Sequence, residues 1–281
     1  MKKEKPVKFY KNPLNRMMLN YGAYVLAPAE RLALYIVTFA IGGAVGLVFY
    51  SGLFKNSYGN PTTATQISDA VFFILVGLVA NRFLAPIYHE NRLKNQQKKL
   101  ESQFLTLLDS LASSLASGSN TQRAFENAYS DLLVQYSEND FIVRETRQII
   151  DGVAQNFSID VILRDFAARS GNDNIMNFAE VFYTCFSKGG NMQTTVLGTY
   201  NSIREKIMID DEIQTKLTSN KIQLNLMSVM PIVIVAMLRL TNPSFAASFA
   251  TPSGVVANTV AIGIFVGAYK FGQKVVSLGA K

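Results

Sequence analysis

Apolar residues are arranged along this chain in two ways: as long runs near the ends and as single residues at helical spacing between them. Long apolar runs lie in pairs near each end, at residues 32–54 and 67–88 and at residues 221–240 and 255–271. Residues 89–220, between the two pairs, are more polar and carry apolar side chains at helical spacing. A soluble protein spreads its apolar residues at helix or strand period throughout. The pattern therefore predicts an all-α membrane protein with four transmembrane helices and one helical bundle.

The first apolar run gives the clearest membrane signal. Residues 32–54 contain no charged side chain, and at about 1.5 Å per residue they reach about 34 Å, enough to cross a hydrocarbon core about 30 Å thick. The second run has Asp69 near one end and Arg82 near the other, and the third contains Pro231, which membrane helices tolerate. For the last two runs the alternative is a pair of helices buried in a soluble core, which their length alone would allow.

Lysine and arginine mark one side of the predicted spans. They are frequent before the first span, after the second, before the third and after the fourth, whereas the loops 55–66 and 241–254 hold only Lys55. By the positive-inside rule, both termini and residues 89–220 are cytoplasmic and the two loops face outward. We therefore expect a multi-pass protein of the cytoplasmic (inner) membrane. Arg239, at the outer end of the third span, is the exception and can snorkel to the interface.

The terminal segments flank this arrangement. Residues 1–31 are basic and contain aromatic and apolar side chains, among them Phe9, Tyr10 and Tyr21. Two interpretations stay open for them: a segment that lies on anionic lipid at the membrane interface, or a solvated tail that only sets the topology. Residues 272–281 form a short cytoplasmic tail after the last span.

Residues 89–220 predict a bundle of about six helices with short connections. Gly118, Gly189 and Gly190 are expected at turns that end helices, and Asn120 or Thr121 is expected to cap the helix that follows Gly118. The first and sixth helices are expected to continue into the second and third spans. Apolar side chains at helical spacing are expected to face the core: Phe104, Leu107, Leu108, Leu111, Leu115, Ala124, Phe125, Ala128, Tyr129, Leu132, Leu133, Tyr136, Val161, Ile162, Phe166, Ala167, Phe178, Val181, Phe182, Cys185 and Phe186.

Composition limits the chemistry that the chain can carry. The net charge of +7 could indicate a nucleic-acid or anionic-lipid partner; because the basic residues follow the membrane edges, we interpret it as a topology signal and expect no nucleic acid. One cysteine, Cys185, allows no intrachain disulfide, and with the single histidine, His89, it cannot make a zinc site. No phosphate-binding loop or hydrolase motif occurs. These observations favour a protein without catalytic residues or cofactor.

Two acidic features have competing interpretations. Asp210, Asp211 and Glu212 are consecutive, so on a helix they point in different directions; a solvated or partner-facing patch is favoured over a metal site. Asp69 is the only aspartate in or beside a span, whereas a membrane aspartyl protease needs two opposed aspartates, so that function is rejected.

Three stretches of the chain carry a family resemblance. Residues 108–119 form a small-residue helix ending in a glycine turn, residues 166–170 precede a turn and a helix that closes at residues 188–191, and residues 203–206 lead into a membrane helix with Met230 and Pro231. Over about residues 100–240 this order resembles the type II secretion F-protein family, in particular the platform proteins of Tad (Flp) pilus machines. The family commonly has glycine before its fourth helix, where this chain has Gln155, Asn156 and Phe157; asparagine also tolerates the left-handed conformation.

The resemblance implies a non-enzymatic scaffold at the base of a pilus or secretion machine. Its expected partners are a hexameric secretion ATPase, a second, paralogous platform protein, pilin subunits and membrane lipids, within a homo- or hetero-oligomer. The polar side chains expected to contact these partners are Arg169, Arg204, Asp210, Asp211 and Glu212. The alternative is a transporter or permease subunit, whose candidate polar residues in the spans are Asn225, Ser228, Asn258 and Thr259.

Overall fold

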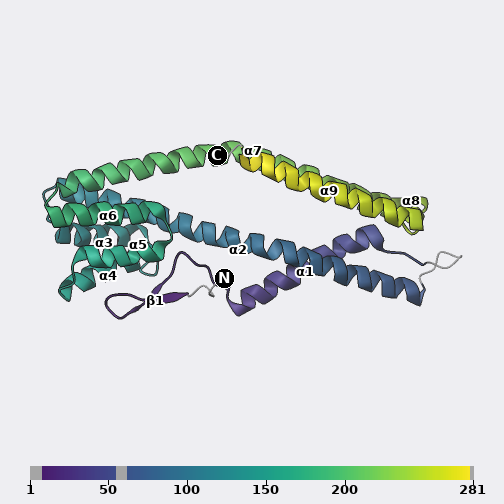
Figure 1. Cartoon of the computed structure of the whole chain (residues 1–281), viewed down its shortest axis with the longest axis horizontal. Helices are drawn as coiled ribbons and strands as arrows, with labels where there is room; N and C mark the ends of the chain where they lie inside the picture. Colours follow the sequence, from purple (N-terminus) through teal and green to yellow (C-terminus); the bar gives the residue numbers. More distant parts are fainter. Residues whose placement is uncertain (1–7, 55–61, 279–281) are drawn as a thin grey trace. The chain divides into compact units, whose positions relative to one another are not determined.

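The computed structural model describes residues 8–54 and 62–278, so Lys55 and the basic residues before Lys8 lie outside the described part. Two short strands, β1 (Phe9–Lys11) and β2 (Met17–Leu19), pair antiparallel, and the described elements after them are helical (Figure 1). The helices are α1 (Pro28–Tyr50), α2 (Thr63–Ala116), α3 (Thr121–Gln135), α4 (Phe141–Ala154), α5 (Ile159–Ser170), α6 (Asp173–Lys188), α7 (Met192–Thr241), α8 (Pro243–Phe249) and α9 (Pro252–Leu278).

The chain divides into two compact units. The core unit contains the residues up to Leu26 and His89–Ile209, and the span unit contains Ala27–Tyr88 and the residues from Asp210 onward. Helices α2 and α7 contribute to both units, because each runs without a break through the boundary. The predicted continuation of the bundle helices into the second and third spans is therefore confirmed at the level of secondary structure. On α7 the core unit ends at Ile209, eleven residues before the expected end of the bundle at residue 220.

The core unit is organised around large apolar side chains. Phe104, Phe125, Phe166, Phe178 and Phe182 are each 0–1% exposed, and leucine and isoleucine side chains fill the space between them. Four of the predicted inward side chains are instead substantially exposed, namely Leu133 (39%), Val161 (44%), Val181 (48%) and Phe186 (42%). For these four the prediction was wrong. Leu133, Val161 and Val181 stand at the edges of the apolar stripes, so the helix turns them away from the core. Phe186 lies in the last turn of α6 and stacks on Phe182 with ring centroids 5.7 Å apart.

Asparagine side chains cap the starts of two core helices, and a residue with left-handed backbone conformation precedes a third. The Asn120 side chain accepts a hydrogen bond from the backbone N–H of Arg123 and caps α3, as predicted. Asn172 caps α6 in the same way. Before α5, Asn156 adopts φ +64°, so asparagine takes the left-handed position that the resemblance assigns to glycine.

The N-terminal segment differs from both expectations. Residues 8–26 are part of the core unit, where the β1–β2 hairpin precedes Tyr21, a side chain that is 1% exposed. The strands were missed because each has only three residues. Neither a solvated tail nor a purely interfacial segment would bury a tyrosine in the core of the protein.

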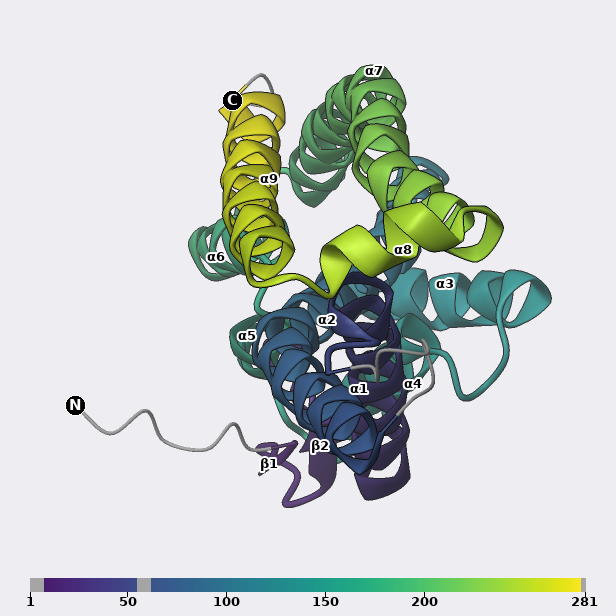
Figure 2. The same cartoon turned by 90° about the vertical axis from the view of Figure 1, so that its right-hand side faces the viewer.

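The span unit holds the four apolar helices. Within the described residues, four helices are long and apolar enough to cross a membrane: α1, and stretches of α2, α7 and α9. Helix α8 lies in the expected outer loop 241–254 and bridges the ends of α7 and α9 (Figure 2). Helix α1 buries Thr38, Gly42, Gly43 and Gly46. The described chain is thus an all-α protein, apart from the small hairpin, with four candidate membrane spans.

Candidate functional site

The structure distributes the five predicted partner-contact residues over three places. Arg169, on α5, is buried with 4% exposure. Arg204, on α7 in the core unit, is exposed and donates to the Tyr200 hydroxyl over 3.4 Å. Asp210, Asp211 and Glu212 are exposed at the start of the α7 stretch that belongs to the span unit, and Glu212 pairs with Lys216 at 2.8 Å. Arg204 and the three acidic residues lie at the surface, whereas Arg169 is enclosed.

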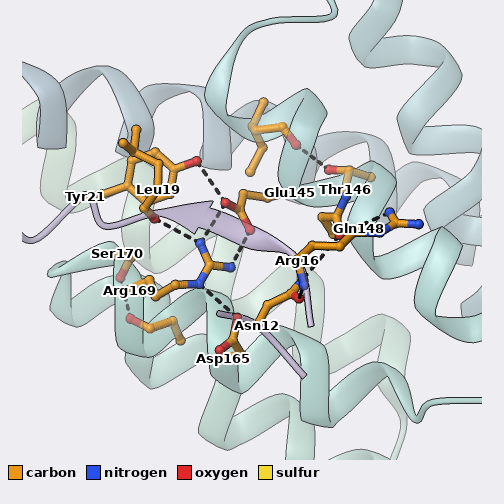
Figure 3. A network of polar contacts seen from close by, with 12 residues as sticks. Asn12, Arg16, Leu19, Tyr21, Glu145, Thr146, Gln148, Asp165, Arg169 and Ser170 are labelled. Atoms are coloured by element: carbon orange, nitrogen blue, oxygen red, sulfur yellow. Dashed lines mark hydrogen bonds and ion pairs between the residues drawn. The ribbon is translucent and has the colours of Figure 1, made fainter. Parts of the chain in front are cut away.

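Arg169 forms the centre of a buried polar network (Figure 3). Its guanidinium donates two hydrogen bonds to the Glu145 carboxylate, over 2.9 and 2.7 Å, and a third to Asp165 over 2.8 Å. Glu145, on α4, is 2% exposed. A bidentate arginine–carboxylate pair has fixed geometry, and its burial means that loss of Arg169 would leave the Glu145 carboxylate buried without a counter-charge. Arg169 is therefore a structural residue that joins α4 to α5.

The N-terminal segment completes this network. The Tyr21 hydroxyl donates to Glu145 over 2.9 Å, and Arg169 donates to the Leu19 carbonyl over 3.1 Å. The Tyr21 ring packs edge-on against Phe141 and Phe166, with ring centroids 5.2 and 6.3 Å apart. One tyrosine thus satisfies a buried carboxylate with its hydroxyl and fills part of the core with its ring.

Backbone contacts hold the same segment at the end of α5. The N–H groups of Tyr21 and Gly22 both donate to the Arg169 carbonyl, over 2.8 and 3.1 Å. Gly22 lies against Gly171, which ends α5 with φ +62°; a Cβ added to Gly171 would stand 2.5 Å from the Cα of Gly22. Gly171 is needed both for its left-handed conformation and for this close approach.

A second, more exposed set of contacts lies beside the hairpin. Asn12 and Arg16 both donate to the Gln148 side-chain oxygen, over 3.2 and 3.3 Å, and Arg16 pairs with Asp151 at 2.6 Å. We call the contacts of residues 12–22 with α4 and α5 the N-terminal clasp. The clasp attaches the segment that directly precedes α1 to the core unit.

The surroundings of Tyr21 and Arg169 favour the protonated form of both side chains. Burial, followed by the charge and hydrogen bond of Glu145, raises the pKa of Tyr21 well above its ordinary value, so the hydroxyl stays protonated as a donor. Burial would lower the pKa of Arg169, but the hydrogen bonds and charges of Glu145 and Asp165 outweigh this effect and raise it. Arg169 therefore remains charged over the physiological range.

A sequence signal for part of the clasp existed. Glu145 lies between Ile142 and Ile149 on the buried face of α4, at the spacing of one helix face. A carboxylate on an apolar face needs a partner. The identity of that partner was hidden, because Arg169 is 24 residues away and Tyr21 is 124 residues away in sequence.

The three predicted turn glycines have different physical roles. Gly118 and Gly189 adopt φ +88° and +77°, and neither would bring a Cβ within 4 Å of another atom. Both are required for backbone conformation. Gly190 lacks a left-handed conformation; a Cβ there would approach the Cys185 sulfur to 2.8 Å, so this glycine is needed for space.

In the span unit, polar groups pair with one another around an apolar cavity. The cavity has a volume of about 610 Å³ and is lined by apolar residues of α1, α2, α7 and α9, with Asn258 among them. Asn258 lies 3.5 Å from the Phe49 carbonyl, and Thr259 lies 3.0 Å from the Tyr50 hydroxyl. Arg239 donates to the carbonyls of Leu47, Val48 and Ser51 at the end of α1, a position where helices favour cations.

Metal-binding groups are not clustered in the described part of the chain. No group of three or more histidine, cysteine, aspartate or glutamate side chains there could hold a metal ion. Cys185 is half-buried and lies 3.4 Å from the Thr195 hydroxyl. The described site is instead a structural connection: a buried network of charged hydrogen bonds that joins the N-terminal segment, α4 and α5.

Comparison with known protein families, with curated proteins and with solved structures finds no match in any of the three.

Proposed function

We propose that this protein is a membrane platform of a Tad (Flp) pilus or a related secretion machine. It couples a hexameric cytoplasmic ATPase to the movement of pilin subunits, beside a second, paralogous platform protein. The main support for the proposal is that α2 and α7 each belong to both units. Both continue from the packed core unit into apolar stretches long enough to span a membrane. The family resemblance supplies the partners.

The proposal has a clear physical basis. A protein that performs no nucleotide chemistry must obtain work from a motor, and differential contacts with that motor in two states are needed to move it. Helices that continue between the units can transmit a displacement. The clasp adds a third connection, because α1 begins at Pro28, two residues after the last core-unit residue, Leu26.

The proposed orientation follows the lysine and arginine distribution. The core unit and both termini are cytoplasmic, in the cytoplasmic (inner) membrane, and α8 lies on the outer side. Protease added outside intact cells should leave residues 89–220 uncut, whereas protease added to inverted vesicles should cleave them. Cleavage of this region from outside would contradict the orientation and the ATPase contact with it.

Partner contacts can be tested by site-specific photocross-linking in membranes. A photoreactive residue in place of Arg204 or Glu212, both exposed on α7, should form adducts with the ATPase or the second platform protein. The same residue in place of the exposed Gln122 on α3 is the matched control. Recovery of neither partner from any position, including co-purification of the unmodified chain, would contradict the platform function.

No described feature favours the alternative, a transporter subunit. Of its candidate polar residues, Asn225 lies 3.4 Å from the Tyr269 hydroxyl and Ser228 donates to the Leu224 carbonyl over 2.7 Å. The contacts of Asn225, Asn258 and Thr259 are the kind that join membrane helices, whereas that of Ser228 lies within α7. Solute flux through vesicles that contain this chain alone would reverse the ranking of the two functions.

A further inference from the structure

A pocket of about 310 Å³ lies in the core unit, between the hairpin turn, α3 and the first two turns of α4. Three arginines line it: Arg16 from the turn before β2, and Arg144 and Arg147 from α4. Arg144 and Arg147 are three residues apart and thus neighbours on one helix face. Guanidinium groups from two distant segments of the chain are therefore brought together at one surface.

The three arginines differ in how far their charges are satisfied. Arg16 pairs with Asp151 at 2.6 Å, and Arg147 donates to the neutral Tyr129 hydroxyl over 3.1 Å. Arg144 is half-buried, and it takes part in no ion pair among residues 8–54 and 62–278. Burying a charge without a counter-ion is costly, so Arg144 is the group that an anion would stabilise most.

The remaining lining adds neutral donors and one acid. The Gln148 side-chain oxygen accepts from Asn12 and Arg16, so neither bond uses the side-chain amide N–H groups of Gln148. Asn139 lines the same pocket, as does Glu138. Counting Arg16, Arg144 and Arg147 against Glu138 and Asp151, the surplus is one positive charge.

We propose that this pocket binds a phosphoryl group. Arginine presents a rigid fork of N–H donors that matches phosphate oxygens, and its weakly hydrated charge suits a partly buried site. A phosphate monoester carries about −1.5 to −2 charges at pH 7 and three acceptor oxygens, enough for donors from both Arg144 and Arg147. The pocket volume lies at the lower end of the range for small-molecule sites, about 300–1,000 Å³.

The occupant is a phosphoryl group, either of a small soluble monoester or of an anionic phospholipid headgroup. The lipid phosphate is a diester with one negative charge and two non-bridging oxygens, still enough to accept from both Arg144 and Arg147. Because Arg16 and Gln148 also belong to the N-terminal clasp, the pocket exists only while the hairpin is docked on α4. Ligand binding therefore stabilises the docked segment by mass action. This inference depends on the core unit alone, so it would stand even if no ATPase were recruited.

The test uses the full chain purified in an uncharged detergent. Glycerol 3-phosphate is the soluble probe, and short-chain phosphatidylglycerol is the lipid probe, with short-chain phosphatidylcholine as its zwitterionic counterpart. Binding is measured by titration and by hydrogen exchange of peptides covering residues 12–22 and 138–148. Protection by glycerol 3-phosphate identifies a soluble ester as sufficient; protection by phosphatidylglycerol alone identifies the headgroup.

Variants locate the site. Arg144→Gln and Arg147→Gln should each weaken binding about tenfold or more, the loss typical of one charge-assisted hydrogen bond. Arg144→Lys keeps the charge without the fork and should lie between wild type and Arg144→Gln. Arg123→Gln, which removes an exposed arginine on α3, should bind as wild type does. Absence of binding by both probes, equal affinity in Arg144→Gln and wild type, or an equal loss in Arg123→Gln would overturn the proposal.

Discussion

The core unit and the span unit use large and small residues in opposite ways. In the core unit, leucine and phenylalanine are buried, as Leu108 and Phe178 show with 0% exposure each. In the span unit, large aliphatic side chains are exposed, as Ile36 and Val37 show at 58% and 54%, while Gly42 is buried. Apolar side chains turn outward where the surroundings are themselves apolar, so the contrast supports a lipid environment for the span unit.

The two units also differ in what joins their helices. Helices α1 and α2 approach each other through glycines: a Cβ on Gly42 would lie 2.3 Å from the Ala80 Cβ, and one on Gly77 would lie 2.7 Å from the Phe39 ring. In lipid, close backbone approach replaces the hydrophobic effect as the source of helix association. The core unit instead buries large side chains and specifies one arrangement with a charged network. Each mechanism predicts a different sensitivity to mutation.

The largest effect is expected at the buried ion pair. Arg169→Ala should destabilise the core unit by about 3–5 kcal/mol, because it leaves the Glu145 carboxylate buried without its partner. Hydrogen exchange of peptides from α4 and α5, measured on the full chain in detergent, reports this loss without interference from the span unit.

Two variants control this experiment. Arg164→Ala removes an arginine from the same helix, where the guanidinium lies 4.8 Å from the Tyr183 ring centroid at the surface, and should cost about 1 kcal/mol or less. The triple variant Tyr21→Phe, Glu145→Leu and Arg169→Met should recover much of the lost stability, since a buried ion pair and the hydroxyl bonded to it can be replaced by apolar side chains. An Arg169→Ala variant as stable as Arg164→Ala would refute the importance of the network.

The second prediction concerns the glycine contact in the span unit. Gly42→Leu should destabilise the α1–α2 contact by up to about 3 kcal/mol through overpacking, because the new side chain meets Ala80 and the Val76 carbonyl. Thr38 and Asn81, which are hydrogen-bonded across the two helices, provide the measurement: as a cysteine pair in a Cys185→Ser background, they should cross-link less in the Gly42→Leu variant.

The control for Gly42 lies in the same unit. A Cβ at Gly263, on α9, would meet nothing within 4 Å, so Gly263→Leu should leave the cross-linking yield unchanged. An equal loss in both variants would mean that leucine affects the span unit by some route other than the α1–α2 contact.

The sequence predicts those parts of the fold that depend on local patterns, and it predicts less well those that depend on contacts between distant residues. The apolar runs and the helical stripes are local patterns, and the spans, the core helices and the turns at Gly118 and Gly189 followed from them. Boundaries were less accurate: α1 begins at Pro28 where residue 32 was expected, and α9 extends to Leu278. The placement of Val161 and Val181 failed because both lie at the margin of a stripe, where small rotations decide burial.

The clasp illustrates what local patterns cannot give. Tyr21 is part of a segment that contains many basic residues, and nothing nearby indicates that its ring enters a core whose other fully buried members begin at Leu100. Arg169 was expected to contact a partner because of the family resemblance; it is buried instead, and Glu145 and Asp165 satisfy its charge. Pairings of this kind depend on the tertiary structure.

The third prediction uses the protonation of Tyr21. The pKa of Tyr21 in the folded protein is raised above the unfolded value of about 10. The stability that the protonated hydroxyl contributes is therefore fully present below pH 10. Above pH 10 the unfolded tyrosine loses its proton while the folded one keeps it, and stability should fall by about 1.4 kcal/mol per pH unit. Tyr21→Phe should cost about 1.5 kcal/mol at neutral pH, for the lost bond to a charged acceptor, and should abolish this part of the slope.

The comparison variant is Tyr183→Phe. Tyr183 is 41% exposed, so removal of its hydroxyl should leave the neutral-pH stability nearly unchanged. Denaturant unfolding of the full chain at about pH 8 and pH 11 measures the neutral-pH stability and the alkaline slope of Tyr21→Phe. An unchanged alkaline slope in Tyr21→Phe would contradict the assigned burial of the Tyr21 hydroxyl.

The smallest effect separates backbone conformation from packing within the core unit. Gly118 and Gly198 both have open space where a Cβ would stand, but only Gly118 has a left-handed φ, whereas Gly198 lies inside α7. Gly118→Ala should therefore destabilise the core unit by about 1 kcal/mol, and Gly198→Ala should stabilise it by about 0.5–1 kcal/mol through helix propensity. Opposite signs in denaturant unfolding are the decisive result. Equal destabilisation by both substitutions would contradict this explanation. It would mean that other atoms, such as those of a bound partner, occupy the space beside both glycines.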